Sequence, residues 1–355
     1  MSKERKRLAG VIGLLIVLAA GTAVWAGDDF VIGGTRVKAG SAASGLLAVP
    51  RGKDSSGTEI PYTVINGAKK GKVLALVAGL HAYEYPPILA LYRLKTMIDP
   101  RALRGTLLMV HIANLPSFKK RTIYYGPDDW KNLNRVFPGD LQGTMSQRIA
   151  AVLNEEVVGR ADALIDMHCG DGNEALIPYT YWMISGNKGF DAGTRDLALA
   201  FGLPHIIIDD TRGNDLKNSK YLGNTAILRG KPAITTEAGF LGRTDEESVG
   251  LNVRGALSVL RHLGMIDGRP EPAADPVWID RYEVVYSKWS GLFTPRAGMG
   301  SYVREGQIVG TVTDYLGVPK EDVRAPFTGI LLYIIGTPPC NEGEPLFEVG
   351  RVKEK

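Results

Sequence analysis

Two residues of metal-ligating type, His81 and Glu84, lie three positions apart in the segment GLHAYE, which follows an apolar run. A second histidine, His168, closes the segment Asp166-Met-His168 far downstream. Zinc accepts imidazole nitrogen and carboxylate oxygen, and a catalytic zinc site uses three protein ligands so that its fourth position stays open for water. The set His81, Glu84 and His168 therefore predicts one Zn²⁺ per chain and a hydrolase rather than a binding protein.

Two further carboxylates could serve the same site. Asp166 lies two residues before His168 on the same strand face, where it could hold the imidazole in the required tautomer. Glu237 ends another apolar run, and we assign it as the general base. A carboxylate near zinc can accept the proton of an activated water and later pass it to the leaving nitrogen. The alternative for Glu237 is an acid that caps a helix.

A polar cluster, NLNRVFPG at residues 132–139, contains Asn134 and Arg135, and Arg121 lies upstream of it. The planar guanidinium group binds carboxylates through two parallel hydrogen bonds. We therefore expect Asn134, Arg135 and Arg121 to bind an acidic end of the substrate, with Arg135 also polarising the scissile carbonyl. A structural ion pair is the alternative for Arg135, and a solvated surface is the alternative for Arg121.

The elements that would position these residues alternate between short β-branched runs and helical patterns from about residue 60. This alternation is typical of an α/β domain with a largely parallel sheet. The pattern predicts strands at 73–78, 106–112, 163–168, 205–208 and 232–236, and helices at 86–98, 144–158, 194–201 and 246–262. The metal candidates and Glu237 then lie at the carboxyl ends of strands, where α/β sheets usually bind ligands.

The sequence changes character after the predicted catalytic domain, residues 27–266. A proline-rich linker at 267–276 precedes short β patterns at 277–355. Val303–Val309 and Cys340–Leu346 align at a constant offset of 37, so that Cys340 takes the place of a core valine. Two such halves resemble the barrel-sandwich of biotinyl and lipoyl carrier domains, but no lysine stands at a carrier-type hairpin tip. We expect a small all-β domain that shapes the mouth of the active site and has no covalent cofactor.

The composition and the first 26 residues indicate the size of the core, the class of partner and the location of the protein. The 355 residues are 45% hydrophobic and 23% charged, which is enough for a large core. The formal charge of +4 comes largely from residues 1–26; the rest of the chain has 38 basic and 37 acidic groups, so nucleic acid is not expected as a partner. Residues 1–26 read as a signal peptide cleaved after Ala26, which predicts a periplasmic protein; an uncleaved inner-membrane anchor is the alternative.

The other cysteine and histidine residues are expected to have structural rather than catalytic roles. Cys169 and Cys340 are expected to be free, buried thiols. His111, His205 and His262 lack the spacing of ligands, and we expect structural roles for them.

Four motifs, GLHAYE, NLNRVFPG, Asp166-Met-His168 and Glu237-Ala-Gly239, occur in the order found in the succinylglutamate desuccinylase/aspartoacylase family, which the chain resembles over about residues 30–350. The resemblance implies a zinc-carboxypeptidase-like mixed sheet flanked by helices, followed by a barrel-sandwich-like β domain. It also implies removal of acyl groups from N-acylated amino acids. Residue by residue, it implies zinc on His81, Glu84 and His168, catalysis by Glu237, and substrate contacts from Asn134, Arg135 and Arg121.

The expected activity is a zinc-dependent amidohydrolase that deacylates an N-acyl amino acid or a similar small carboxylate-bearing amide. An export signal is atypical of cytosolic amino-acid catabolism, so neither succinylglutamate nor acetylaspartate is assumed. An exported zinc carboxypeptidase acting on peptides or cell-wall fragments and a non-catalytic exported binding module are the alternatives. A tail tyrosine could complete the site, but no motif selects among Tyr302, Tyr315 and Tyr333, and the oligomeric state stays open.

Overall fold

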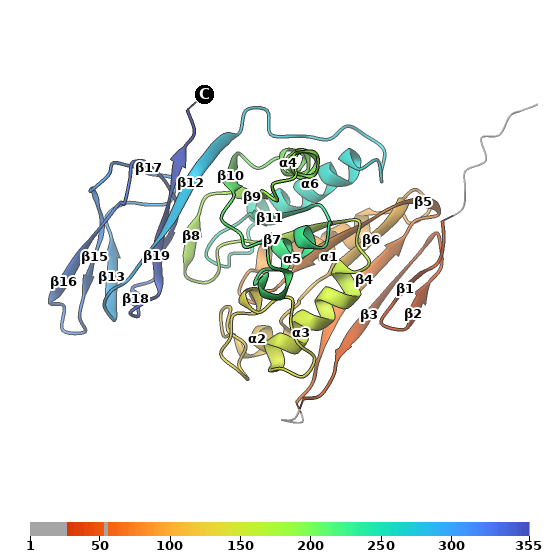
Figure 1. Ribbon diagram of the computed structural model, residues 1–355, viewed down its shortest axis with the longest axis horizontal. Helices are drawn as coiled ribbons and strands as arrows, with labels where there is room; N and C mark the ends of the chain where they lie inside the picture. Colours follow the sequence, from red (N-terminus) through yellow and green to blue (C-terminus); the bar gives the residue numbers. More distant parts are fainter. Residues whose placement is uncertain (1–26, 53–55, 355) are drawn as a thin grey trace, which may run out of the picture.

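The computed structural model describes residues 27–52 and 56–354, and the expected signal segment lies outside them. The chain has an α/β fold in which a thirteen-stranded mixed sheet runs through the molecule, with a four-stranded sheet at one end (Figure 1). Among the described residues, no helix combines the length and the apolar character needed to cross a membrane.

Four central strands carry most of the predicted site and run parallel in the spatial order β6-β5-β7-β11. They are β6 (Arg104–Val110), β5 (Lys69–Ala78), β7 (Ala163–His168) and β11 (Ala233–Glu237). Antiparallel strands flank them: β4 (Thr58–Asn66) and β3 (Ser41–Val49) on one side, and β9 (Tyr179–Met183) on the other. The sheet as a whole is mixed, which confirms the mixed sheet that the resemblance implies, while the pattern of a largely parallel sheet holds for the centre.

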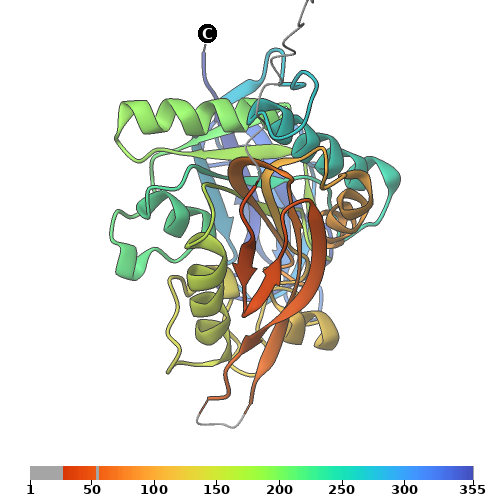
Figure 2. The same cartoon turned by 90° about the vertical axis from the view of Figure 1, so that its right-hand side faces the viewer.

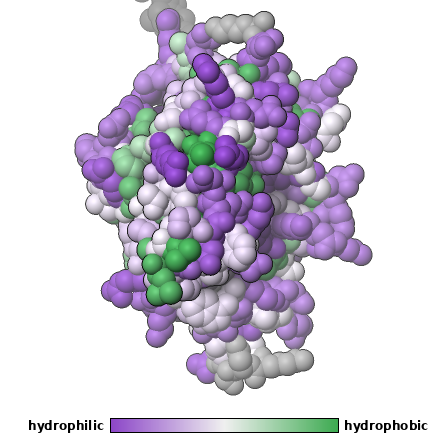
Figure 3. Space-filling view, turned by 90° about the vertical axis from the view of Figure 1, so that its left-hand side faces the viewer, coloured by the Kyte–Doolittle hydropathy of each residue, from purple (hydrophilic) through white to green (hydrophobic). Residues whose placement is uncertain are grey.

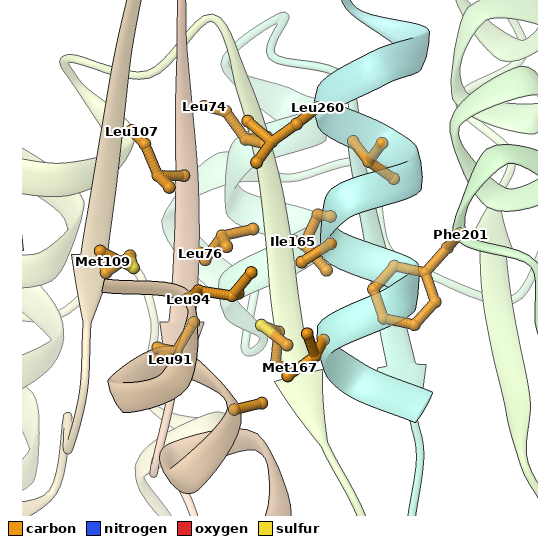
Figure 4. Packing of buried hydrophobic residues seen from close by; sticks show 14 of the residues in the cluster. Leu74, Leu76, Leu91, Leu94, Leu107, Met109, Ile165, Met167, Phe201 and Leu260 are labelled. Carbon is orange, nitrogen blue, oxygen red and sulfur yellow. The ribbon is translucent and has the colours of Figure 1, made fainter. Parts of the chain in front are cut away.

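Helices cover both faces of this sheet. One face carries α1 (Tyr85–Met97), α4 (Lys188–Phe201) and α6 (Glu246–His262), and the other carries α3 (Met145–Leu153) and α5 (Leu222–Leu228). Successive side chains of a strand point to opposite faces, so β5 sends Leu74 and Leu76 to the first face and Ala75 and Val77 to the second. Figure 4 shows the first face, where strand residues pack against Leu91, Leu94 and Leu260. Each buried leucine there contributes about 1.5–3 kcal/mol.

The shorter elements complete the catalytic part. A capping box formed by Thr144 and Gln147 begins α3, as predicted, and a π-helical turn, Asn154–Val158, follows it. The remaining pieces are the hairpin β1 (Phe30–Ile32) and β2 (Thr35–Val37), helix α2 (Leu115–Lys120), and the 3₁₀ turns Leu133–Arg135 and Leu216–Asn218. Figure 2 shows the β1–β2 hairpin lying in front of β3 and β4.

The C-terminal β region continues the main sheet. Strand β12 (Val277–Tyr286) pairs with the edge of β10 (His205–Asp209), and β19 (Pro345–Val352), β17 (Gly329–Ile335) and β14 (Tyr302–Val303) follow in order. Strand β8 (Glu174–Leu176) of the catalytic part also pairs with β17. The pairing of β12 with β10 satisfies the backbone groups that β10 would otherwise leave open at a sheet edge.

A second sheet packs on this continuation and makes the tail a sandwich. It consists of β16 (Pro319–Arg324), β15 (Ile308–Thr313), β13 (Gly291–Pro295) and β18 (Pro339–Cys340). The repeated positions Val303, Val309, Cys340 and Leu346 are all buried in the core between the two sheets, as the internal repeat predicts. Cys169 and Cys340 are free and buried, which confirms that prediction. On the outer side of the four-stranded sheet, hydrophilic residues predominate and hydrophobic residues form separate patches (Figure 3).

Candidate metal centre and active-site cavity

The carboxyl ends of β5 and β7 bring the three predicted metal ligands together. His81 and Glu84 lie on the loop between β5 and α1, and His168 is the last residue of β7. Gly79 starts the loop with φ +69°, and a Cβ there would lie 2.9 Å from the Cα of Ile112, so the turn requires glycine. One ligand atom of each side chain lies within 4.8 Å of the others.

The hydrogen bonds around the two imidazoles define which nitrogens face the centre. Asn132 Oδ1 accepts from the backbone N–H of Asn134 at 2.9 Å, so it is the oxygen that lies 3.0 Å from Nε2 of His81. Asp166 Oδ1 lies 3.0 Å from Nε2 of His168. Both oxygens only accept, so each Nε2 donates, and the lone pair of each Nδ1 is left facing the centre.

Glu84 occupies the position between these two Nδ1 atoms. Its Oε1 lies 2.7 Å from Nδ1 of His81, and its Oε2 lies 2.8 Å from Nδ1 of His168. With neutral imidazoles these contacts would join acceptors to acceptors in a buried place, so a proton or a metal ion has to lie between them. Two nitrogens and one carboxylate oxygen are a donor set that suits zinc, so the residues present fit the metal that the resemblance implies.

The charges at the centre agree with this arrangement. Glu84 is 2% exposed, and burial would raise its pKa, but the imidazoles of His168 and His81 lower that pKa to about 2. Burial would lower the pKa of His168, but the carboxylates of Asp166 and Glu84 raise it well above its ordinary value. The site therefore stabilises positive charge between its carboxylates.

Asn134 and Asp166 form a buried hydrogen-bonded pair behind His168. Asn134 Oδ1 accepts from the backbone N–H of Leu222 at 2.9 Å, which ties the Leu133–Arg135 turn to the start of α5. Its Nδ2 donates to Asp166 Oδ2 at 3.4 Å. Asn134 also lines the larger of the two cavities described below.

Glu237 lies beside the metal ligands. It ends β11 and is the register partner of His168 on the neighbouring parallel strand. Asp245, not Glu237, caps the following helix α6, which removes the helix-capping alternative. Burial raises the pKa of Glu237 well above its ordinary value, and the charge of His168 opposes this increase.

Two adjoining cavities open next to the centre, with volumes of about 540 and 340 Å³. They share a common wall of His81, Arg135, Tyr181, Glu237, Val284, Tyr286 and Glu348. Three of these residues, Val284, Tyr286 and Glu348, come from the C-terminal β region. The tail therefore forms part of the cavity, as the sequence predicts.

The two arginines that were predicted to bind substrate lie in different surroundings. Arg135 lines both cavities, and its guanidinium carbon lies 4.8 Å from the ring centroid of Tyr221. Arg121 is exposed at the C-terminal end of α2 and lines neither cavity. This position favours the alternative of a solvated surface for Arg121, because α2 ends at Lys120 and the basic run lies on the outside.

A different arginine, Arg212, lines the larger cavity and was missed by the sequence interpretation. Its side chain is 14% exposed and forms an ion pair through Nε with the fully buried Asp209. Its guanidinium carbon lies 4.0 Å from the centroid of Tyr221. The available signal was an Asp-Asp-Thr-Arg run directly after the predicted strand 205–208, a strand-end position like those of the metal ligands.

The tail tyrosines are also distinguished by the structure. Tyr333 lines the smaller cavity, whereas Tyr302 and Tyr315 are 65% and 73% exposed and line neither. Tyr282 and Tyr286 of β12, which no motif indicated, line the larger cavity. The predicted contribution of a tail tyrosine thus extends to several side chains.

The histidines that were assigned structural roles lie outside the cavities. His111 is 2.8 Å from Oγ1 of Thr63, and Nδ1 of His205 is 3.0 Å from the carbonyl oxygen of Pro178. His262 is exposed at the end of α6. None of the three lines either cavity.

With this geometry established, comparison with known proteins identifies the family. The model of the succinylglutamate desuccinylase/aspartoacylase catalytic domain matches residues 70–263. The chain belongs to the succinylglutamate desuccinylase/aspartoacylase family. An N-alpha-acetyl-L-2,4-diaminobutyric acid deacetylase from Halomonas elongata is 28% identical over 322 residues, which cover 87% of this chain and 92% of the relative.

Solved structures of the family share the fold. A succinylglutamate desuccinylase/aspartoacylase from Rhodobacter sphaeroides has a TM-score of 0.77 at 28% identity, covering 88% of this chain and 96% of that one. The product-bound ectoine utilization protein EutE from Ruegeria pomeroyi has a TM-score of 0.77 at 25% identity, covering 87% and 95%. The family and these relatives support a hydrolase of the deacylase type.

Proposed function

We propose that the protein is an exported, zinc-dependent amidohydrolase that removes the acyl group from an N-acyl amino acid. The observation that carries the proposal is the convergence of His81, Glu84 and His168, with Glu237 in register beside His168 in a cavity that also contains arginine. The related deacetylase from Halomonas elongata acts, by its name, on an N-acetylated amino acid, which supports the same reaction here.

The reaction adds water across an amide and yields a carboxylate and an amine. Zinc, when bound, would lower the pKa of water to about 7 and polarise the carbonyl. Glu237 would accept the proton of the attacking water and deliver it to the leaving nitrogen. Arg135, in the wall common to both cavities, would stabilise the negative charge that develops on the carbonyl oxygen. Asp166 and Asn132 would hold the two imidazoles in the tautomer that offers Nδ1.

The carboxylate of the substrate would bind to Arg212. The ion pair with Asp209 uses Nε, which leaves the terminal nitrogens of the guanidinium for a carboxylate. The ring of Tyr221 lies against both Arg212 and Arg135 and would keep the two guanidinium groups in place. In this proposal Arg212 has the role predicted for Arg121.

The size of the cavities favours a small substrate over a peptide or a cell-wall fragment. The larger cavity has a volume of about 540 Å³, and Tyr282, Tyr286 and Glu348 of the tail form part of its wall. Export is proposed from residues 1–26 alone. The expected observation is a mature protein in the periplasmic fraction whose mass corresponds to a chain beginning at Gly27; a full-length membrane-bound form would indicate an anchor instead.

The proposed base is tested by Glu237→Gln, which keeps the shape of the side chain and removes its basicity. Turnover on a panel of N-acyl amino acids should fall by about 10²–10⁴-fold, while elemental analysis still finds one zinc per chain. Glu247→Gln, at an exposed position of α6, is the matched control and should leave turnover unchanged. Retained turnover in the zinc-loaded Glu237→Gln enzyme would remove Glu237 from the mechanism. Wild-type protein without stoichiometric metal and without hydrolysis would indicate the non-catalytic binding module.

A further inference from the structure

A buried carboxylate of the tail, Glu348, has no part in the mechanism above. It lies on β19, is 1% exposed, and belongs to the wall that the two cavities share. Its register partners are Val284 on β12 and Tyr333 on β17, and both also line cavity walls. The main sheet therefore delivers this acid from the end of the chain to the proposed substrate site.

The carboxyl group of Glu348 has one oxygen without a partner among the described residues. No ion pair involving Glu348 is found in the described part of the chain, and its Oε2 has no hydrogen-bond partner there. Arg212, the cation that most favours its ionised form, is already paired with Asp209. Tyr179 and Tyr181 also stabilise the ionised form, but burial dominates and raises the pKa of Glu348 to about 8. A cation that binds next to such a buried acid stabilises its ionised form.

The two cavities also differ in the ionisable side chains that line them. The larger cavity contains Arg212 and Lys220, whereas the smaller one contains Asp171 and Glu174. Glu348 lies where the two meet. A molecule with a carboxylate at one end and a cationic group at the other would match these linings, because its carboxylate would meet Arg212 and its cation would favour the ionised form of the buried acids.

We propose that Glu348 binds a positively charged group on the side chain of the substrate, so that the enzyme selects N-acyl diamino acids. The inference rests on the proposed deacylase function. The substrate carboxylate binds at Arg212, and the side-chain ammonium donates to the unpartnered Oε2 of Glu348. A neutral side chain leaves that oxygen unpaired in a buried place, and an acidic side chain repels it.

Three substrates of nearly equal shape test the proposal: N-acetyl-L-2,4-diaminobutyrate, N-acetyl-L-norvaline and N-acetyl-L-glutamate. The zinc-loaded wild-type enzyme should prefer the cationic substrate over the neutral one by on the order of 100-fold in kcat/KM, and the acidic one should be poorest. In Glu348→Gln, kcat/KM for the cationic substrate should fall by on the order of 100-fold while that for N-acetylnorvaline changes by less than about threefold. A purely structural role would lower both values together, so the ratio is the decisive quantity.

Two further measurements keep the test independent of the variant's folding and of turnover. Glu342→Gln, at an exposed position of the same tail, should leave the substrate ratio at the wild-type value. Calorimetry on the zinc-loaded wild-type protein should show tighter binding of 2,4-diaminobutyrate than of norvaline. Equal binding of these amino acids, or equal losses on both substrates in Glu348→Gln, would overturn the inference and leave the deacylase function standing. Absence of hydrolysis for all three substrates alongside selective binding of 2,4-diaminobutyrate would refute the deacylase function instead.

Discussion

The carboxylate of Asp166 is expected to set the affinity for zinc without touching the metal. Asp166 is fully buried and accepts from Nε2 of His168 at 3.0 Å and from Nδ2 of Asn134 at 3.4 Å. Asp166→Asn keeps the volume of the side chain but removes the charge that makes the imidazole a stronger ligand. Loss of such a partner typically weakens metal binding by about 10–100-fold, which corresponds to about 1.4–2.7 kcal/mol.

The assay is a competition between the apo-protein and a chromophoric zinc chelator at constant pH. Asp128→Asn, an exposed position in the same part of the chain, is the matched control and should keep the wild-type Kd. His168→Ala, which removes a proposed ligand, should lose more affinity than Asp166→Asn. If His168→Ala and Asp166→Asn both bind zinc with the wild-type Kd while remaining folded by circular dichroism, the metal does not lie at His168 and the proposed centre is refuted.

Three other predictions concern the metal, Arg212 and the buried His111. Zinc at 1,000 times its Kd should stabilise the fold by about 4 kcal/mol, so removal with a chelator should lower the Tm in calorimetry; an unchanged Tm would contradict a native metal site. Arg212→Lys keeps a charge for Asp209 but loses the planar fork, so KM should rise by about tenfold or more with a smaller change in kcat, whereas Arg121→Lys should change neither. Burial, aided by Lys95, lowers the pKa of His111 to about 4 from 6.5. Between these values the unfolded chain binds more protons, so stability should fall by up to about 3 kcal/mol as pH drops from 6.5 to 4, and His111→Asn should remove that part of the slope in denaturant titrations.

The metal centre could be predicted because its residues obey a simple rule of sheet geometry. His168 and Glu237 end neighbouring parallel strands, and His81 and Glu84 follow a third strand that pairs with the same sheet. Parallel strands bring their carboxyl ends to one edge, so residues distant in sequence meet there. The apolar runs in the sequence were clear enough to locate each strand end to within one or two residues.

The arginine that faces the proposed substrate site could not be predicted from the positions of strand ends. Arg121 and Arg212 both lie in polar segments between elements, and charge alone does not say which segment returns to the cavity. Arg212 does so because Asp209, fully buried at the end of β10, holds its Nε and because Tyr221 packs on its face. Both contacts depend on tertiary neighbours, one of them on another loop, which a periodic pattern does not reveal.

The contribution of the tail depends on a sheet that continues across the predicted domain boundary. A proline-rich linker at 267–276 indicates a boundary, yet β12 directly after it pairs with β10 and continues the catalytic sheet. Glu348 alternates with Phe347 along β19, and in an isolated sandwich such a position would face solvent. In this chain Phe347 packs in the tail core, while Glu348, on the opposite face, lies in the wall of the catalytic cavity. Because one sheet spans both regions, the last strand of the chain supplies a side chain to the site, and the tail is part of the active-site structure rather than a detachable cover.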